Sequence, residues 1–213
     1  RGGDPLIGGR SMRRGFDIGT RLGLDDINLL RARGFEVAFR YLGPDAAFGG
    51  PKGLDGAEVA GYLSRGLGIE LIGQKTANIP EYFTYVQGLQ DGRDYRDWAL
   101  TLGAPLGIPI RFPVDTDMSD PATEANPYFN GAYDGLDGAY GLGVYGEYDL
   151  VEAVARHYAG VVTTWQTAAW SGGRISELAD AYQYGSIEIR PGLTIDLNIV
   201  RTEPKWRLVR GIA

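Results

Sequence analysis

The sequence of 213 residues contains no cysteine and a single histidine, His157. Without cysteine there is no disulfide framework, no thiolate metal site and no cysteine nucleophile, and one histidine cannot anchor a histidine-rich metal site. No apolar run approaches the roughly 18 residues that a membrane-spanning helix needs, so we expect no membrane span. The first residues also lack the apolar core of a signal peptide, so we expect no signal segment within this chain, which is compatible with trimming of an exported precursor before Arg1.

Basic residues are outnumbered, since 21 Lys and Arg stand against 27 Asp and Glu and give a net charge of −6. A nucleic-acid partner requires a basic face, so we expect none. The length suits either one barrel-sized domain or two small ones, and the lack of a linker favours one domain. Residues 1–14 are rich in glycine and arginine and are predicted to form an N-terminal arm, with the domain over residues 15–213.

Short apolar runs alternate with helical patterns along the chain. Eight alternations in a chain of this length predict an α/β protein with a TIM (β/α)8 barrel as a single domain, and a doubly wound open sheet is the alternative. The predicted helices cover residues 25–34, 56–65, 95–102 and 149–158, with a glycine-rich helix within 127–140 and a brief helical turn before residue 180. The predicted strands cover residues 16–18, 36–42, 69–74, 110–118, 142–146, 161–167, 180–184 and 193–198.

Polar and aromatic residues stand at the ends of most predicted strands, which favours the barrel. In a barrel the functional groups converge from the C-terminal ends of many strands, whereas an open nucleotide-binding sheet concentrates a glycine-rich phosphate loop after one. The strand-end residues are Asp17, Arg40 with Tyr41, Asp115 with Asp117, Trp165 with Gln166, Gln183, and Asp196 with Asn198.

The stretch 110–118 ends in two carboxylates one residue apart, Asp115 and Asp117. In a strand, side chains at i and i+2 leave the same face roughly 6.5–7 Å apart, so both are expected to point into the barrel mouth. Asp17 and Asp196 are expected to join them there, and crowded carboxylates force at least one pKa upward. One protonated acid beside one ionised carboxylate is the requirement of glycosidic bond hydrolysis. The alternative is that either aspartate of the pair caps the following loop or helix.

Aromatic rings near these acids would offer apolar faces to sugar rings, and amide or guanidinium groups would bind sugar hydroxyls. The alternative for each ring is a place in the core or its upper rim. The predicted substrate-binding residues are Tyr41, Tyr145, Trp165 and Trp170 among the aromatics, and Arg40, Gln74, Gln166, Gln183 and Asn198 among the polar side chains.

Other motifs lack the position or spacing that a cofactor or metal site needs, so no cofactor and no metal is expected. The glycines of residues 141–146 match a dinucleotide fingerprint, but they overlap a predicted strand instead of following one. Asp115, Asp117, Asp120 and Glu124 superficially match a calcium loop but have the wrong spacing and lack its glycine. There is no Gly-x-Ser-x-Gly elbow, which disfavours a serine hydrolase of that type.

Several short fragments, in this order and spacing, resemble a known family. It is the glycoside-hydrolase-like domain once called domain of unknown function 1906, whose members are TIM barrels related to the family 25 lysozymes that cut peptidoglycan. The resemblance extends from about Gly15 to Val200. The fragments are Gly15-Phe16-Asp17, Phe39-Arg40-Tyr41-Leu42-Gly43-Pro44, Val114-Asp115-Thr116-Asp117, Gly143-Val144-Tyr145-Gly146, Trp165-Gln166-Thr167-Ala168-Ala169-Trp170-Ser171 and Ile195-Asp196-Leu197-Asn198.

The resemblance implies roles for the four aspartates. Asp17 and Asp196 match the aspartates of the first and last strands, and Asp115 matches the first acid of the lysozymes' Asp-x-Glu motif. Asp117 stands where the lysozymes carry the glutamate that serves as general acid, and its side chain is one methylene shorter. Glu147, just after the fifth predicted strand, is a residue that could compensate.

The expected function is hydrolysis of a cell-envelope glycan such as peptidoglycan. Asp117 is the expected general acid and Asp115 the stabiliser or base, while Asp17 and Asp196 tune their ionisation. The alternative is a non-catalytic glycan-binding or structural module with a degenerate hydrolase site; a barrel enzyme acting on another small substrate has no motif in its favour. The expected partner is the glycan, and the expected location is extracellular or at the cell envelope, including a phage virion.

Overall fold

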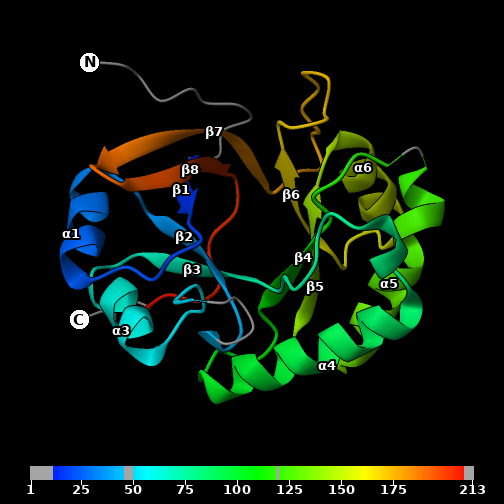
Figure 1. Ribbon diagram of the computed structural model, residues 1–213, viewed down its shortest axis with the longest axis horizontal. Helices are drawn as coiled ribbons and strands as arrows, with labels where there is room; N and C mark the ends of the chain where they lie inside the picture. Colours follow the sequence, from blue (N-terminus) through cyan, green and yellow to red (C-terminus); the bar gives the residue numbers. More distant parts are fainter. Residues whose placement is uncertain (1–11, 46–49, 119, 209–213) are drawn as a thin grey trace.

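Eight strands close into one barrel in the order of the chain, from β1 to β8. The computed structural model describes residues 12–45, 50–118 and 120–208 (Figure 1). The predicted TIM-like barrel is therefore confirmed. The strands are β1 (Arg13–Asp17), β2 (Val37–Tyr41), β3 (Gly68–Ile72), β4 (Pro109–Pro113), β5 (Gly141–Gly146), β6 (Thr163–Thr167), β7 (Ala181–Arg190) and β8 (Leu193–Val200).

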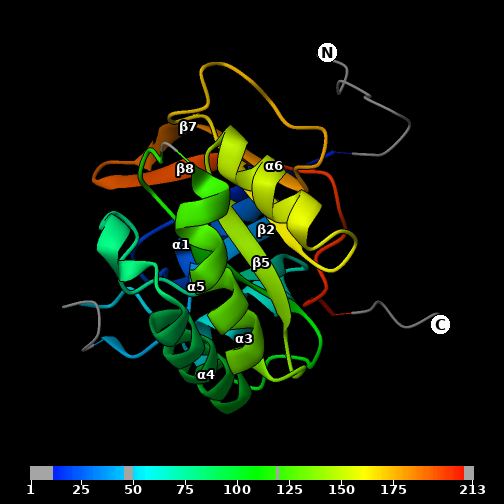
Figure 2. The ribbon, with the colours of Figure 1, turned by 90° about the vertical axis from the view of Figure 1, so that its right-hand side faces the viewer.

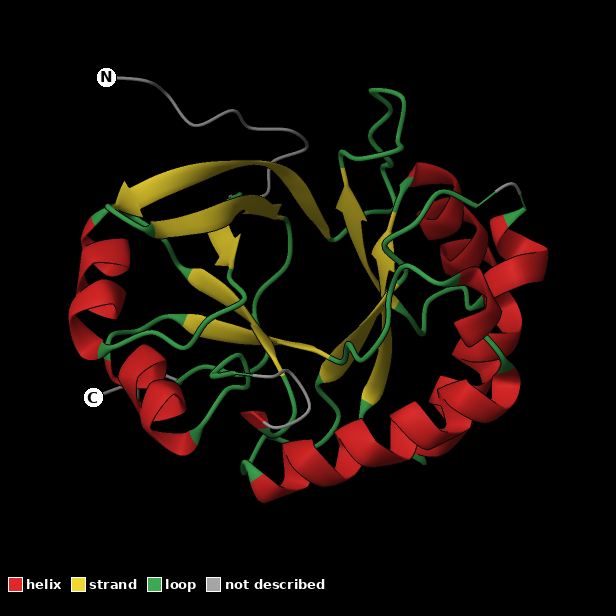
Figure 3. Cartoon of the chain, viewed as in Figure 1, coloured by secondary structure: helices red, strands yellow, loops and turns green. Residues whose placement is uncertain are grey.

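The helices cover the outside of the barrel between successive parallel strands (Figures 1 and 3). Two of them begin earlier than the sequence predicted, because Thr84 and Asp120 act as N-caps and accept hydrogen bonds from the amides of Gln87 and Thr123. The described helices are α1 (Leu24–Ala32), α3 (Gly56–Ser64), the 3-10 turn η1 (Pro80–Tyr82), α4 (Tyr85–Thr101), α5 (Pro121–Leu136) and α6 (Tyr148–His157).

The glycines that obscured α5 in the sequence make its packing against α4 possible (Figure 2). Gly88 and Gly92 of α4 and Gly131 and Gly135 of α5 are each four residues apart, so each pair lies on one helix face. A Cβ atom on Gly88 would lie 2.0 Å from the carbonyl oxygen of Tyr128, and one on Gly131 would lie 2.1 Å from that of Tyr85. The two helix backbones therefore touch, and the close contact outweighs the low helix propensity of glycine.

The regular alternation of strands and helices ends after β6. The predicted strand at 180–184 is the start of a ten-residue strand, β7, which turns directly into β8. Strand β8 runs antiparallel to both β7 and β1, whereas the other neighbouring strands are parallel. In the described chain no helix lies outside this hairpin (Figure 3), and the residues between β6 and β7 form turns where a brief helical turn was predicted.

The boundary predicted for the N-terminal arm was placed too late. Strand β1 begins at Arg13, so Arg13 and Arg14 belong to the barrel, while residues 1–11 lie outside the described part of the chain. Within the described ranges, no helix is both long enough and apolar enough to cross a membrane.

Buried side chains fill the inside of the barrel. The buried Arg111 and Glu70 form an ion pair. Phe39 stacks on Trp165 with their ring centroids 4.5 Å apart. Polar side chains lie at the C-terminal ends of the parallel strands, where TIM barrels place their sites.

Candidate active site

A cavity of about 300 Å³ opens at the C-terminal ends of the parallel strands. It combines carboxyl, amide, hydroxyl and aromatic groups contributed by all eight strands or by the loops that follow them. A cavity of this size can take about one sugar ring. Its lining consists of Asp17, Tyr41, Lys52, Ile72, Gln74, Pro113, Asp115, Tyr145, Trp165, Thr167, Ala169, Gln183 and Asp196.

Asp17 lies on the cavity floor at the end of β1 and is 4% exposed. One carboxyl oxygen accepts hydrogen bonds from Gln183 Nε2 at 2.9 Å and from Asn198 Nδ2 at 2.8 Å. These bonds favour the charged form, but burial outweighs them and raises the pKa of Asp17 from 3.8 to about 7, with a smaller contribution from the charge of Asp196. Near neutral pH, Asp17 therefore retains a proton in a substantial fraction of molecules.

Asp196 of β8 lies directly opposite Asp17 in the antiparallel register. The two carboxyl groups interact, and this interaction raises the pKa of Asp17 and lowers that of Asp196. Burial raises the pKa of the half-buried Asp196, although the interaction with Asp17 opposes the shift. Because the pKa of Asp17 is raised to about 7, the pair retains a proton to higher pH than two separate aspartates would.

Asp115 completes a group of three carboxyls at the cavity. It lies in the loop after β4, where its amide donates to the carbonyl oxygen of Ala77 at 2.6 Å. Burial raises the pKa of its carboxyl, and the charge of Asp196 adds to the shift. Among the described residues, no group of three or more acidic, histidine or cysteine side chains is arranged to hold a metal ion.

The prediction that Asp117 points into the barrel with Asp115 is wrong. Strand β4 ends at Pro113, and the amide of Asp115 bonds to a neighbouring loop instead of continuing the sheet. The alternation of strand faces therefore does not extend to Asp117, which is exposed and does not line the cavity. Glu147 is also outside the cavity, because its carboxylate caps α6 by accepting from the amides of Asp149 and Leu150.

Two of the predicted sugar-binding aromatics orient the amides that hold Asp17. The hydroxyl of Tyr145 donates to Gln183 Oε1 at 2.8 Å, and the indole nitrogen of Trp165 donates to Asn198 Oδ1 at 2.8 Å. Each contact fixes which end of the amide is the donor, so both –NH₂ groups face Asp17. Tyr145, Trp165 and Gln183 also line the cavity, whereas Asn198 is buried behind them and does not.

Arg40 and Gln166 do not reach the cavity, which corrects their prediction as substrate-binding residues. Their neighbours Phe39 and Trp165 point into the barrel, so the alternation of a strand directs Arg40 and Gln166 outward. Arg40 is fully buried and pairs with Glu58 of α3 at 3.0 Å. Gln166 is fully buried and donates to the carbonyl oxygen of Arg174 at 2.8 Å, which fixes the loop after β6.

Of the remaining predicted residues, the structure brings two to the cavity and leaves one outside. Tyr41 and Gln74 line it. Trp170 is 46% exposed and is not part of the lining. Its backbone has a φ of +55°, in the left-handed region that bulky side chains rarely adopt.

Lys52 also lines the cavity and was not predicted from the sequence. Among the described residues that line the cavity it is the only cationic side chain, and its Nζ lies 3.7 Å from the centroid of the Tyr41 ring. A signal was available, because Lys52 is a single basic residue in a loop of glycine and proline after a barrel strand.

The chain is similar to known proteins in sequence and in fold. The family model of the Rv2525c-like, glycoside hydrolase-like domain matches residues 28–200. The fold is similar to that of the Mycobacterium tuberculosis Tat-secreted protein Rv2525c in complex with L-tartrate, at a TM-score of 0.71 and 19% identity over 92% of this chain and 97% of that one. Among proteins with curated descriptions, none matches the sequence.

More distant structures have the same fold. A family 25 glycosyl hydrolase from Bacillus anthracis is similar at a TM-score of 0.55, with 12% identity over 94% of this chain and 93% of that one. The modular autolysin LytC from Streptococcus pneumoniae, in complex with a synthetic peptidoglycan ligand, gives a TM-score of 0.53 and 13% identity over 88% of this chain and 46% of that one. At these identities the likeness concerns the fold alone.

Proposed function

The chain belongs to the family of Rv2525c-like, glycoside hydrolase-like domains, and from this membership we propose that its cavity binds a sugar of a cell-envelope glycan and hydrolyses a glycosidic bond. The observation that carries the proposal is the Asp17–Asp196 pair, which retains a proton near neutral pH beside a third carboxyl, Asp115. One acid and one ionised carboxylate are the minimum for this reaction.

The proposed reaction uses the pair as the acid. Asp196 passes the retained proton to the leaving oxygen as the glycosidic C–O bond breaks, and Asp17 supplies the proton to Asp196. Asp115 remains ionised, stabilises the positive charge that develops on the sugar ring and then accepts a proton from the attacking water. Return of that proton to the pair regenerates the site.

The choice of a cell-envelope glycan, with peptidoglycan as the leading candidate, rests on the relatives. A fold neighbour is an autolysin with a synthetic peptidoglycan ligand, and a relative of the same family description is a Tat-secreted protein. We accordingly propose that this protein acts outside the cytoplasm, at the cell envelope. Tyr41, Gln74 and Gln183 are the lining side chains that would bind the sugar's hydroxyl and amide groups.

A non-catalytic glycan-binding module is the second candidate, and one observation favours it. Asp117 lies outside the cavity, although it matches the position of the general-acid glutamate in the family 25 lysozymes that the sequence resembles. In that case the carboxyls would accept hydrogen bonds from sugar hydroxyls without transferring a proton.

Release of reducing ends from purified cell walls tests the proposal. Asp115→Asn and Asp196→Asn should each lower the rate by about 10²–10⁴-fold, the usual contribution of a positioned acid or base. Asp117→Asn is the matched control and should retain the rate of the unmodified protein. Co-sedimentation with the same walls, without release of reducing ends between pH 5 and 8, would establish the binding module instead.

A further inference from the structure

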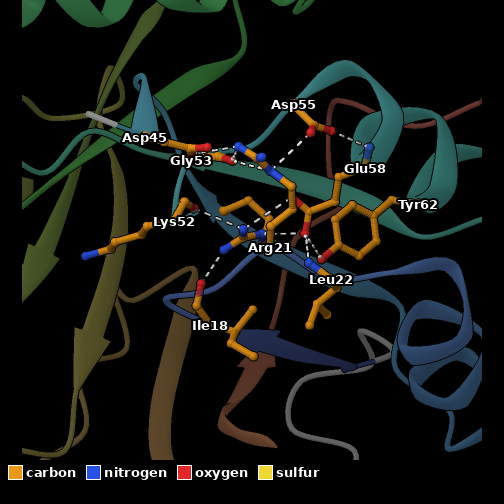
Figure 4. Close-up of polar contacts among 10 residues, drawn as sticks. Ile18, Arg21, Leu22, Asp45, Lys52, Gly53, Asp55, Glu58 and Tyr62 are labelled. Atoms are coloured by element: carbon orange, nitrogen blue, oxygen red, sulfur yellow. Dashed lines mark hydrogen bonds and ion pairs between the residues drawn. The ribbon is translucent and has the colours of Figure 1, made fainter. Parts of the chain in front are cut away.

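Two carboxylates outside the cavity, those of Glu58 in α3 and Asp91 in α4, are buried and hydrogen-bonded. Burying a charge is costly unless donors surround it, so each carboxylate fixes the groups that donate to it. Glu58 accepts from the amide of Leu22 at 3.0 Å and from the hydroxyl of Tyr62 at 2.9 Å, and thereby holds the loop after β1 against α3 (Figure 4). Asp91 holds the loop between β3 and α4, and that loop reaches the cavity.

Asp91 is fully buried and accepts four hydrogen bonds from side chains. Its Oδ1 atom accepts from Lys75 Nζ at 3.0 Å and from Gln87 Nε2 at 2.8 Å. Its Oδ2 atom accepts from the hydroxyl of Tyr82 at 2.8 Å and from that of Tyr128 at 2.9 Å. Lys75 and Tyr82 lie between β3 and α4, whereas the other two donors lie in α4 and α5. The carboxylate therefore connects this loop to the two helices that pack together outside the barrel.

The loop between β3 and α4 contributes to the cavity on both sides of Lys75. Gln74 lines the cavity, and the carbonyl oxygen of Ala77 accepts from the amide of Asp115 at 2.6 Å. Strand β4 ends at Pro113, so the amide of Asp115 is held by this loop and not by the sheet. Lys75 therefore connects the buried carboxylate in α4 to the segment that fixes the backbone of a cavity carboxyl.

We infer that Asp91 is a positioning residue for Asp115, because it holds the loop segment to which the Asp115 backbone is bonded. This rests on the proposed function, in which Asp115 stabilises the positive charge on the sugar ring, and it adds a residue that does not line the cavity. Misplacement of a reacting group by about 1 Å can lower a rate about 100-fold. A carboxylate that fixes this loop through Lys75 therefore affects the reaction without contacting the sugar.

Two variants that each remove one donor to Asp91 distinguish positioning from a purely structural role. Lys75→Met removes the donor in the loop, and Tyr128→Phe removes the donor in α5. Burial raises the pKa of Asp115 and the charge of Asp196 adds to the shift, so the pH midpoint of the Asp115 carboxyl resonance reports its exposure to water. In Lys75→Met this midpoint should fall toward that of an exposed aspartate, whereas loss of the lysine's positive charge alone would raise it. In Tyr128→Phe the midpoint should remain that of the unmodified protein.

Release of reducing ends from cell walls measures the effect on the proposed reaction. Lys75→Met and Asp91→Asn should each lower the rate about 10–100-fold, and Tyr128→Phe should change it by less than about twofold. Combined with Asp115→Asn, Lys75→Met should cause no further loss, because both changes act on the same group. Lys75 also pairs with Asp94, so Asp94→Asn is the control for that contact and should keep both the rate and the midpoint.

An unchanged Asp115 midpoint in Lys75→Met would overturn the inference, as would an equal fall in Tyr128→Phe. Urea unfolding at the same pH checks that each variant is folded during the titration. Asp91→Asn keeps the shape of the side chain and is the second variant; where the unmodified protein cuts walls, an unchanged rate in it or in Lys75→Met would also overturn the inference. The titration needs no substrate, so the expected midpoints in a protein that releases no reducing ends would retain the positioning of Asp115 and reject hydrolysis.

Discussion

The substitution Asp17→Asn should change how the stability of the protein depends on pH. Asparagine has the shape of a protonated aspartate, so its oxygen can accept the bonds from Gln183 and Asn198, and its –NH₂ group can donate to Asp196. The variant therefore keeps the hydrogen bonds of the site and removes one titration. A pH-dependent difference in the free energy of unfolding between the two proteins then measures the free-energy cost of ionising the buried Asp17.

The magnitude follows from the pKa of Asp17, which is raised from 3.8 to about 7 in the folded protein. Between these values the folded state holds a proton that the unfolded state has released, so the free energy of unfolding falls as pH rises and becomes level above the folded pKa. A pKa difference of about 3 corresponds to about 4 kcal/mol over the whole window, and about 3 kcal/mol of this lies between pH 5 and pH 8.5.

Urea unfolding of both proteins at pH 5, 7 and 8.5 measures the effect. Relative to the unmodified protein, Asp17→Asn should gain about 3 kcal/mol between the two extremes, which is roughly 6–12 °C in melting temperature for a chain of this length. Asp25→Asn, which removes an exposed carboxylate in the first turn of α1, is the control and should follow the unmodified protein. A constant offset between Asp17→Asn and the unmodified protein at every pH would refute the reasoning, because Asp17 would then titrate alike in both states.

Three further predictions test the surroundings of the cavity. Asn198→Ala removes a donor that lowers the pKa of Asp17, so the carboxyl resonance of that residue should titrate at higher pH, and an unchanged midpoint would contradict the bond. Gly88→Ala would place a Cβ atom 2.0 Å from a carbonyl oxygen of α5, so it should lower the free energy of unfolding in urea by more than about 3 kcal/mol. Gly56→Ala is the control, because no atom lies within 4 Å of its Cβ position, and it should change the free energy of unfolding by less than about 1 kcal/mol. Glu58→Gln leaves a buried arginine without its counter-ion and should cost about 3–5 kcal/mol, and a loss below 1 kcal/mol would show that the pair is not needed.

The order of strands and helices could be read from the sequence as far as β6. Buried parallel strands are short apolar runs, and the helices between them have their own periodicity and caps. Each element can therefore be predicted from the residues that form it. The start of β7 and the position of β8 were also predicted, but the extension of β7 to Arg190 could not be read in this way, because this outer part is mostly exposed and has no continuous apolar run. Helix α5 was also hard to predict, because glycine disfavours a helix. Its glycines are required by the close contact with α4, which is not visible in the local sequence.

The residues at the strand ends were also identified from the sequence, but their directions were not. Tyr41 and Arg40 are adjacent, and only the closed barrel decides that the first lines the cavity and the second pairs with Glu58 outside it. Likewise, the end of β4 at Pro113 separates Asp115 from Asp117.

By itself the sequence determined the composition of the site: an acidic, aromatic and amide-rich set of residues at the ends of barrel strands, without cysteine or a histidine cluster. The tertiary structure alone decided which carboxyl groups meet. Asp17 and Asp196 are far apart in the chain and become partners only because β8 closes the barrel against β1. The pKa of Asp17 depends on that closure, since burial and the approach of a second carboxyl are properties of the folded barrel and not of any short stretch of sequence.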